Sequence, residues 1–150
     1  MLRNATVVAL IATVDADRAL RFYQDTLGLR LVDDDAFALA FDCNGIQLRI
    51  QKVQTLRPHP FTSLGWAVAA VRREVTTLEK RGVSFERFPF LQQDDLGIWQ
   101  APSGAKIAWF KDPDGNLLSL TEYASRRSRA RSGKARRAPR RRATARRAHR

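Results

Sequence analysis

The sequence predicts an α+β body, residues 1–123, in which two tandem βαβββ units form a pseudo-symmetric cleft. Each half of the body repeats one order of elements: an apolar strand, an amphipathic helix that ends at glycine, and several short strands. The positive charge is confined to one end, because residues 124–150 hold 13 of the 27 Lys and Arg residues and none of the 15 Asp and Glu residues. The formal net charge of +12 therefore belongs to a basic tail, and the body is close to neutral.

The first unit, about residues 5–54, opens with a predicted strand over Val7–Val14, which is rich in β-branched residues. A helix follows, with Asp15 as its N-cap and Gly28 as the left-handed residue that ends it. Apolar residues recur at helical spacing between these two positions. Turn residues then separate three short strands, which we expect at Leu29–Val32, Phe37–Phe41 and Ile46–Val53.

The second unit, about residues 61–123, follows the linker Thr55–Pro60 and repeats this order. Its helix is predicted over Arg73–Gly82, and the sequence Asp-Pro-Asp-Gly-Asn at Asp112–Asn116 predicts a hairpin turn. Its strands are expected at Leu64–Val71, Val83–Phe88, Gly97–Ala101, Lys106–Lys111 and Leu117–Glu122.

Composition and motifs exclude several classes of protein. Cys43 is the single cysteine, so the chain forms no intramolecular disulfide and no cysteine-rich zinc module. No apolar run approaches the about 20 residues that span a bilayer. Asp15 and Asp17 directly follow the N-terminal apolar stretch, which favours a buried strand over a signal peptide, and we expect a cytoplasmic protein. A phosphate-binding glycine loop, a dinucleotide fingerprint and a Ser-His-Asp combination are all missing, so we predict no catalytic residue.

The tail, residues 124–150, is predicted to be disordered, because it consists mainly of Arg, Ala and Ser and has no aromatic residue to bury. Its cations are suited to sequence-independent, salt-dependent contact with nucleic acid. Anionic lipid headgroups are a second candidate partner, and a solvated extension without a partner is the third reading. The predicted polyanion-binding residues are Arg126, Arg127, Arg136, Arg137, Arg140, Arg141 and Arg142.

Two motifs resemble the vicinal oxygen chelate superfamily, which contains glyoxalase I, bleomycin resistance proteins and extradiol dioxygenases. The first is Asp15-x-x-Arg-Ala-x-x-Phe-Tyr-x-Asp-x-Leu-Gly-Leu29, and the second is Trp109-Phe-Lys-Asp-Pro-Asp-Gly-Asn-Leu-Leu118. Together with the duplicated order of elements, the resemblance covers Thr6 to Tyr123 and leaves out the tail. It implies the glyoxalase/bleomycin-resistance fold and a homodimer.

Members of that superfamily often hold a divalent metal on facing strands, and the resemblance assigns the corresponding positions to Val8, Ser63 and Ser119. The first-unit counterpart of the last position is Arg49 or Gln47. Valine offers no donor atom, serine is a poor ligand and arginine repels a cation, so we expect no metal and no other cofactor. The body's single histidine, His59, falls in the linker and is interpreted as a plain loop residue. A divalent metal held in a shifted strand register stays open as an alternative.

Period-two alternation assigns a second set of residues to the cleft. Small residues on the second unit's first strand leave room for a ligand, and Arg49 offers a planar cationic donor fork for an anionic group. Trp66 and Trp109 are expected in the core, whereas Trp99, in a polar loop, is a candidate for stacking on a ligand. The predicted ligand-binding residues are Arg49, Gln47, Gln51, Ser63, Ser119 and Trp99. The alternative for the Gln47–Gln51 strand is a solvated edge or a dimer interface.

Three functions follow as hypotheses. The first is a homodimeric protein that binds a small organic ligand, with anionic molecules among the candidates, and uses no metal. The second is a metal-dependent glyoxalase-like lyase or dioxygenase. The third is a body that its cationic tail tethers to nucleic acid.

Overall fold

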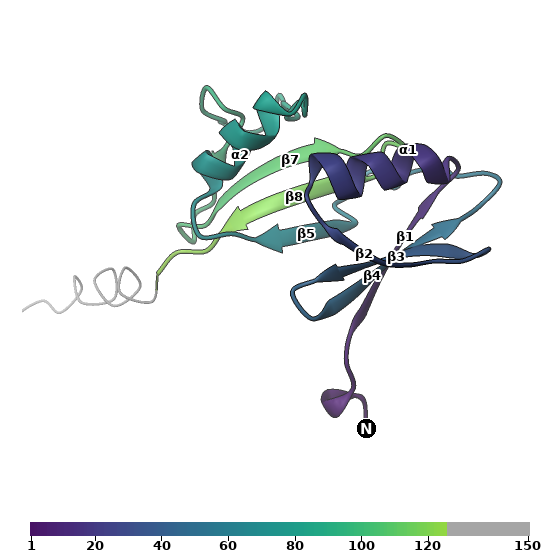
Figure 1. Ribbon diagram of the computed structural model, residues 1–150. Helices are drawn as coiled ribbons and strands as arrows, with labels where there is room; N and C mark the ends of the chain where they lie inside the picture. Colours follow the sequence, from purple (N-terminus) through teal and green to yellow (C-terminus); the bar gives the residue numbers. More distant parts are fainter. Residues whose placement is uncertain (126–150) are drawn as a thin grey trace, which may run out of the picture.

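The computed structural model describes residues 1–125, so the seven arginines predicted to bind polyanions lie outside the described residues. Each of the two units forms a four-stranded mixed sheet (Figure 1). The first sheet has the order β1-β4-β3-β2 and the second the order β5-β8-β7-β6. In both sheets the first strand pairs in parallel with the last strand of its unit, as a duplicated βαβββ unit requires.

The strands fall close to the predicted positions in the first unit and at the closing hairpin of the second. The first sheet contains β1 (Val8–Thr13), β2 (Arg30–Asp34), β3 (Ala38–Cys43) and β4 (Ile46–Lys52). The second contains β5 (Leu64–Ala67), β6 (Trp99–Gln100), β7 (Lys106–Lys111) and β8 (Leu117–Glu122).

Local chemistry sets the helix boundaries. Helix α1 (Ala16–Leu20) begins after Asp15, whose side chain accepts a hydrogen bond from the Arg18 N–H at 3.0 Å. It continues as a π-helical segment, η2 (Arg21–Thr26), and the chain turns at Gly28 with a φ of 76°. Helix α2 (Val71–Lys80) lies over one face of the second sheet (Figure 1). A short 3-10 turn, η1 (Leu2–Asn4), precedes β1, and no helix within residues 1–125 is long and apolar enough to cross a membrane.

The strand predicted over Val83–Phe88 is wrong, because this segment is irregular and keeps a single bridge, between Phe85 and Phe110. The Gln93 side chain takes the place of a neighbouring strand here. Its Oε1 accepts from the Phe88 N–H at 2.7 Å, and its Nε2 donates to the Glu86 carbonyl at 3.0 Å. The following strand also shrinks to Trp99–Gln100, and β5 ends at Ala67, before the predicted Val71, where α2 begins.

One hydrophobic core spans both units. The Tyr23 ring lies 5.9 Å from Phe41 of β3, and Phe22 lies 6.5 Å from Phe110 of β7. Tyr23 is fully buried, and its hydroxyl donates to Asp112 Oδ2 at 2.7 Å. The helical segment of the first unit therefore packs directly against the second unit.

The turn Asp112–Asn116 also fastens the two units together. Asp114 accepts hydrogen bonds from the Thr13 hydroxyl at 2.6 Å and from the Val14 N–H at 2.9 Å. Asn116 Nδ2 donates to the Ala12 carbonyl at 3.0 Å. This turn closes its own hairpin and, at the same time, holds the end of β1.

Candidate functional site

The face of the first sheet that points away from the core carries three of the predicted site residues. Parallel pairing sets Val8 beside Gln47, Leu10 beside Arg49 and Ala12 beside Gln51. Paired residues on neighbouring strands point to the same side of a sheet. The intervening side chains, including Ile11, Leu48 and Ile50, are buried in the core. We call this outward side, made of Val8, Leu10, Ala12, Gln47, Arg49 and Gln51, the open face of the first sheet.

Arg49 has an acidic partner on this open face. Its Nη2 lies 3.6 Å from Asp35 Oδ2, with both side chains about one-third exposed or more. Hydrogen bonds from the Phe37 and Ala38 N–H groups lower the pKa of Asp35, and Arg49 lowers it further. Asp35 thus stays ionised beside Arg49, so an anionic ligand at Arg49 has to replace an existing ion pair.

A pocket of about 420 Å³, which we call the junction pocket, lies where the two units meet, between β1 and the linker. The predicted residues Gln51 and Ser63 line it, whereas Gln47 and Arg49 lie nearer the start of β4 and do not. His59 also lines it, with its ring stacked on Phe61 at a centroid distance of 4.9 Å. The lining residues are Leu10, Ile11, Ala12, Gln51, Leu56, His59, Phe61, Thr62, Ser63 and Asn116.

The sequence did not predict His59 and Phe61 as site residues, because their place in the pocket depends on the path that the linker takes across the first sheet. Pro58 and Pro60 flank His59, and proline restricts the backbone of its neighbours to extended conformations. That stiff segment passes the open face of the first sheet. The prolines were the available signal, although they do not reveal which strand the linker meets.

The second sheet carries an aromatic cluster on its own outward side, defined by Phe88, Phe90, Trp99 and Trp109. The two indole rings are 6.1 Å apart, and Phe88 meets Trp109 edge-on at 5.5 Å. Trp99, the predicted stacking residue, thus has aromatic neighbours. The prediction that Trp109 belongs to the core is wrong, because Ala108 and Phe110 occupy the core side of β7 and alternation turns Trp109 outward. Trp66 does pack against the core, beside Phe110.

The pocket and the aromatic cluster are neighbours, linked by one hydrogen bond. Trp109 Nε1 donates to Thr62 Oγ1 at 3.0 Å, and Thr62 lines the pocket. Ser119, next to Trp109 across the ladder, is only 7% exposed. Its hydroxyl occupies the space that a side chain at Gly65 would need, so among the predicted residues Ser119 presents little surface to a ligand.

The side chains of the described residues do not suit a divalent metal. Within residues 1–125, no group of three or more His, Cys, Asp or Glu residues comes close enough to hold one. Val8, Ser63 and Ser119 stand at the positions that the resemblance assigns to metal ligands, and they supply two hydroxyls and no charge. The Cys43 thiol is half-buried, and burial raises its pKa, which disfavours the thiolate form that a nucleophile needs.

Comparison with known proteins gives one matching family and many similar structures. The model of the Glyoxalase/Bleomycin resistance protein/Dioxygenase superfamily matches residues 5–120. No curated protein sequence gives a significant match.

Three solved structures illustrate the likeness. A superfamily member from Sphaerobacter thermophilus DSM 20745 has a TM-score of 0.64 and 25% identity, with 81% of this chain and 99% of that chain covered. A glyoxalase/bleomycin resistance protein/dioxygenase from Alicyclobacillus acidocaldarius gives 0.61 and 21%, covering 83% and 95%. Lactoylglutathione lyase from Agrobacterium tumefaciens gives 0.60 and 20%, covering 79% and 93%. The last two identities are low enough that these structures share a fold with this chain and no more.

Proposed function

Because the chain belongs to the glyoxalase/bleomycin resistance protein/dioxygenase superfamily, we propose that it binds a small organic ligand in its junction pocket without a metal ion. The observation that carries this proposal is the pocket of about 420 Å³, which the Thr62–Trp109 hydrogen bond places next to the aromatic cluster. Ligand sites are typically concave and mostly apolar, with a few polar groups that fix the orientation of the ligand. This pocket matches that description.

The side chains favour a ligand with a planar aromatic part. Trp99 and Trp109 offer ring faces and edges against which an aromatic group packs well. Gln51 and His59, on the pocket wall, supply hydrogen-bonding groups for a polar substituent. If an anionic substituent reached Arg49, it would replace Asp35 as the partner of the guanidinium.

A homodimer is part of the proposal. Strand β1 is the edge strand of its sheet, and two of its outward side chains, Val8 and Leu10, are 44% and 56% exposed. An exposed apolar edge strand is a surface that another chain tends to cover. Leu10 also lines the junction pocket, so a partner on β1 would adjoin the bound ligand. We also propose a cytoplasmic location, which the single cysteine supports.

The absence of suitable metal ligands among the described residues supports binding over metal-dependent lyase or dioxygenase chemistry. A thermal-shift screen of small aromatic compounds, with added Zn²⁺, Ni²⁺ or Mn²⁺ and with EDTA, separates the two. We expect some compounds to raise the melting temperature, with shifts that EDTA leaves unchanged. If stabilisation or turnover requires a stoichiometric metal, the binding proposal is wrong and the chain is a metal-dependent enzyme.

Matched variants place such a ligand. Gln51→Ala and Trp99→Ala are expected to reduce the shift, because they remove a polar and an aromatic wall of the proposed site. Gln24→Ala, an exposed glutamine on the helical segment, serves as the control. Equal shifts in all three variants would assign the compound to another surface.

A second proposed function concerns the tail, whose 13 basic residues lack acidic neighbours in sequence. We propose that the tail holds the body on nucleic acid through phosphate contacts. Such contacts are independent of sequence and weaken steeply with salt.

A further inference from the structure

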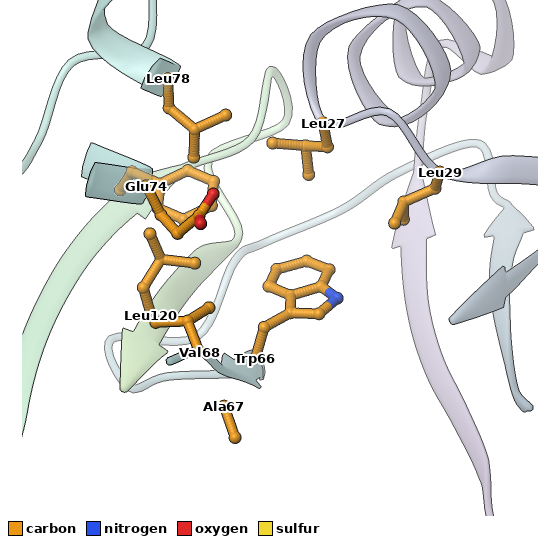
Figure 2. Close-up of a pocket in the computed structure, with 9 residues that line it drawn as sticks. Leu27, Leu29, Trp66, Ala67, Val68, Glu74, Leu78 and Leu120 are labelled. Carbon is orange, nitrogen blue, oxygen red and sulfur yellow. The ribbon is translucent and has the colours of Figure 1, made fainter. Parts of the chain in front are cut away.

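A second cavity lies between the two units (Figure 2). It is on the core side of the second sheet, opposite the aromatic cluster, because Trp66 and Leu120 line it. Its volume is about 200 Å³. Leu27 and Leu29 approach it from the first unit, Leu78 from α2, and Trp66 and Leu120 from the second sheet. An engineered apolar cavity of about 150 Å³ already holds benzene, so this space is large enough for a single aromatic ring.

One side chain on the wall of this cavity departs from the apolar pattern. Helix α2 buries Val71, Val75 and Leu78, and the helical period places position 74 on the same stripe, three residues after Val71 and four before Leu78. The residue there is Glu74. An aliphatic side chain at this position would continue the buried stripe, whereas Glu74 turns a carboxylate toward the cavity (Figure 2).

The Glu74 carboxylate is partly withdrawn from water, with a side-chain exposure of 35%. Arg73 donates to it from Nε at 3.3 Å and from Nη2 at 3.1 Å, and both bonds go to Oε1. The Arg73 guanidinium itself is 73% exposed, so this ion pair lies on the solvent side of the carboxylate. The cavity side offers an apolar wall and one negative group.

The indole of Trp66 completes the arrangement. It extends into the same space as Glu74 and stacks near Phe110, at a centroid distance of 6.5 Å and an interplanar angle of 19°. The face of an indole attracts cations as well as apolar groups. A cation between a carboxylate and an indole is favoured by both, and an anion is disfavoured by the carboxylate.

We propose that this cavity is a second ligand site, separate from the junction pocket, which takes a small aromatic or branched aliphatic amine. The ammonium group pairs with Glu74, and the apolar part lies against Trp66, Leu27 and Leu120. Charge and shape thus give this site a ligand class different from that of the junction pocket.

Benzylamine is the test probe, with benzyl alcohol as its neutral counterpart and benzoate as its anionic one. The three tryptophans of the full chain give three indole N–H signals in a ¹⁵N-labelled sample, and Trp66→Phe identifies the one in this cavity. We expect benzylamine to shift the Trp66 signal saturably and to leave those of Trp99 and Trp109 in place. Benzyl alcohol is expected to bind at least tenfold more weakly, and benzoate not to bind.

Glu74→Gln keeps the shape of the side chain and removes its charge, and we expect it to weaken benzylamine binding at least tenfold. Glu79→Gln, on the exposed side of the same helix, should leave the affinity unchanged. If Glu74 serves only the first turn of α2, its substitution lowers the melting temperature and leaves the affinity as it was. That result, an absence of saturable binding, or shifts confined to Trp99 and Trp109 would each overturn the proposal.

Discussion

The Tyr23 hydroxyl is buried between the two units, where it donates to a carboxylate that has itself lost most of its contact with water. Asp112 also accepts from Asn116 Nδ2 at 2.8 Å and from the N–H groups of Asp114 and Asn116. Burial raises the pKa of this carboxyl, although each of the hydrogen bonds from Asn116 and Tyr23 acts in the other direction. The hydrogen bonds from Tyr23 and Asn116 thus favour the ionised form against the effect of burial.

Tyr23→Phe removes one of these donors without changing the packing of the ring. We expect the variant to lose about 1.5–3 kcal/mol of unfolding free energy, the usual net contribution of a hydrogen bond to a charged group. Thermal and urea denaturation measure this loss, and Tyr123→Phe, at an exposed position, is the matched control. An unchanged melting temperature would mean that the Tyr23–Asp112 contact does not hold the units together.

Asp35 gives a pH-dependent prediction, because its pKa is lowered, whereas that of Asp112 is raised. Backbone hydrogen bonds and Arg49 lower its pKa, so the folded state favours the ionised carboxylate. Its contribution to stability is present above its ordinary pKa of about 3.8 and is lost as the pH falls through the lowered value. We expect Asp35→Asn to melt below the wild type at pH 7 and to converge with it as the pH falls through the lowered pKa. A constant difference across this range would contradict the linkage, and Asp25→Asn is the exposed control.

At the scale of elements, sequence patterns succeed where the cause is local. Asp15 caps its helix, and Gly28 ends the first helical segment with a positive φ, because each depends on a few neighbouring residues. The segment Val83–Phe88 fails the prediction because the Gln93 side chain, from a later loop, satisfies its backbone. Candidate residues follow the same rule. Strand alternation alone places Gln47, Arg49 and Gln51 on one face. Only the tertiary fold brings Asp35 to Arg49, His59 to the junction pocket and Glu74 to the second cavity.

The segment that carries the aromatic cluster depends on Gln93. Besides its bonds to Phe88 and Glu86, its Nε2 donates to the Gly97 carbonyl at 2.7 Å. We expect Gln93→Ala to raise amide hydrogen exchange over residues 86–98 and to leave α2 protected, because the three bonds lie within this one segment. Gln92→Ala, at the exposed neighbouring position, should keep the wild-type pattern. Uniform loss of protection along the chain would instead indicate a global change in stability.

At the scale of the whole molecule, charge divides the chain into two parts, for which we have proposed different partners. Residues 1–125 carry 14 basic and 15 acidic residues, and the remaining 25 residues carry 13 basic and no acidic ones. Total charge alone would have indicated nucleic acid as the main partner. Its location assigns the proposed nucleic-acid contact to the tail, whereas the residues that line the proposed ligand pocket belong to the near-neutral body.

Deletion of residues 126–150 tests this division. We expect the full chain to bind double-stranded DNA at low salt, with an affinity that falls linearly on a log–log plot against salt concentration. The shortened chain should not bind, and its thermal transition should match that of the full chain, since a tail made mainly of Arg, Ala and Ser offers little apolar surface to bury. DNA binding by the shortened chain would assign the contact to the body.

The turn that joins the units has a consequence for the time at which the protein can fold during synthesis. Thr13 donates to Asp114, which lies 101 residues further along the chain, and Tyr23 donates to Asp112, which lies 89 residues further along. A ribosome that has released only the first unit has exposed these two hydroxyls and half of the shared core, but not the carboxylates that receive them. The first unit is therefore expected to remain incompletely folded until the last hairpin emerges. Until then, while the second unit is being synthesised, its exposed apolar surface is prone to aggregation.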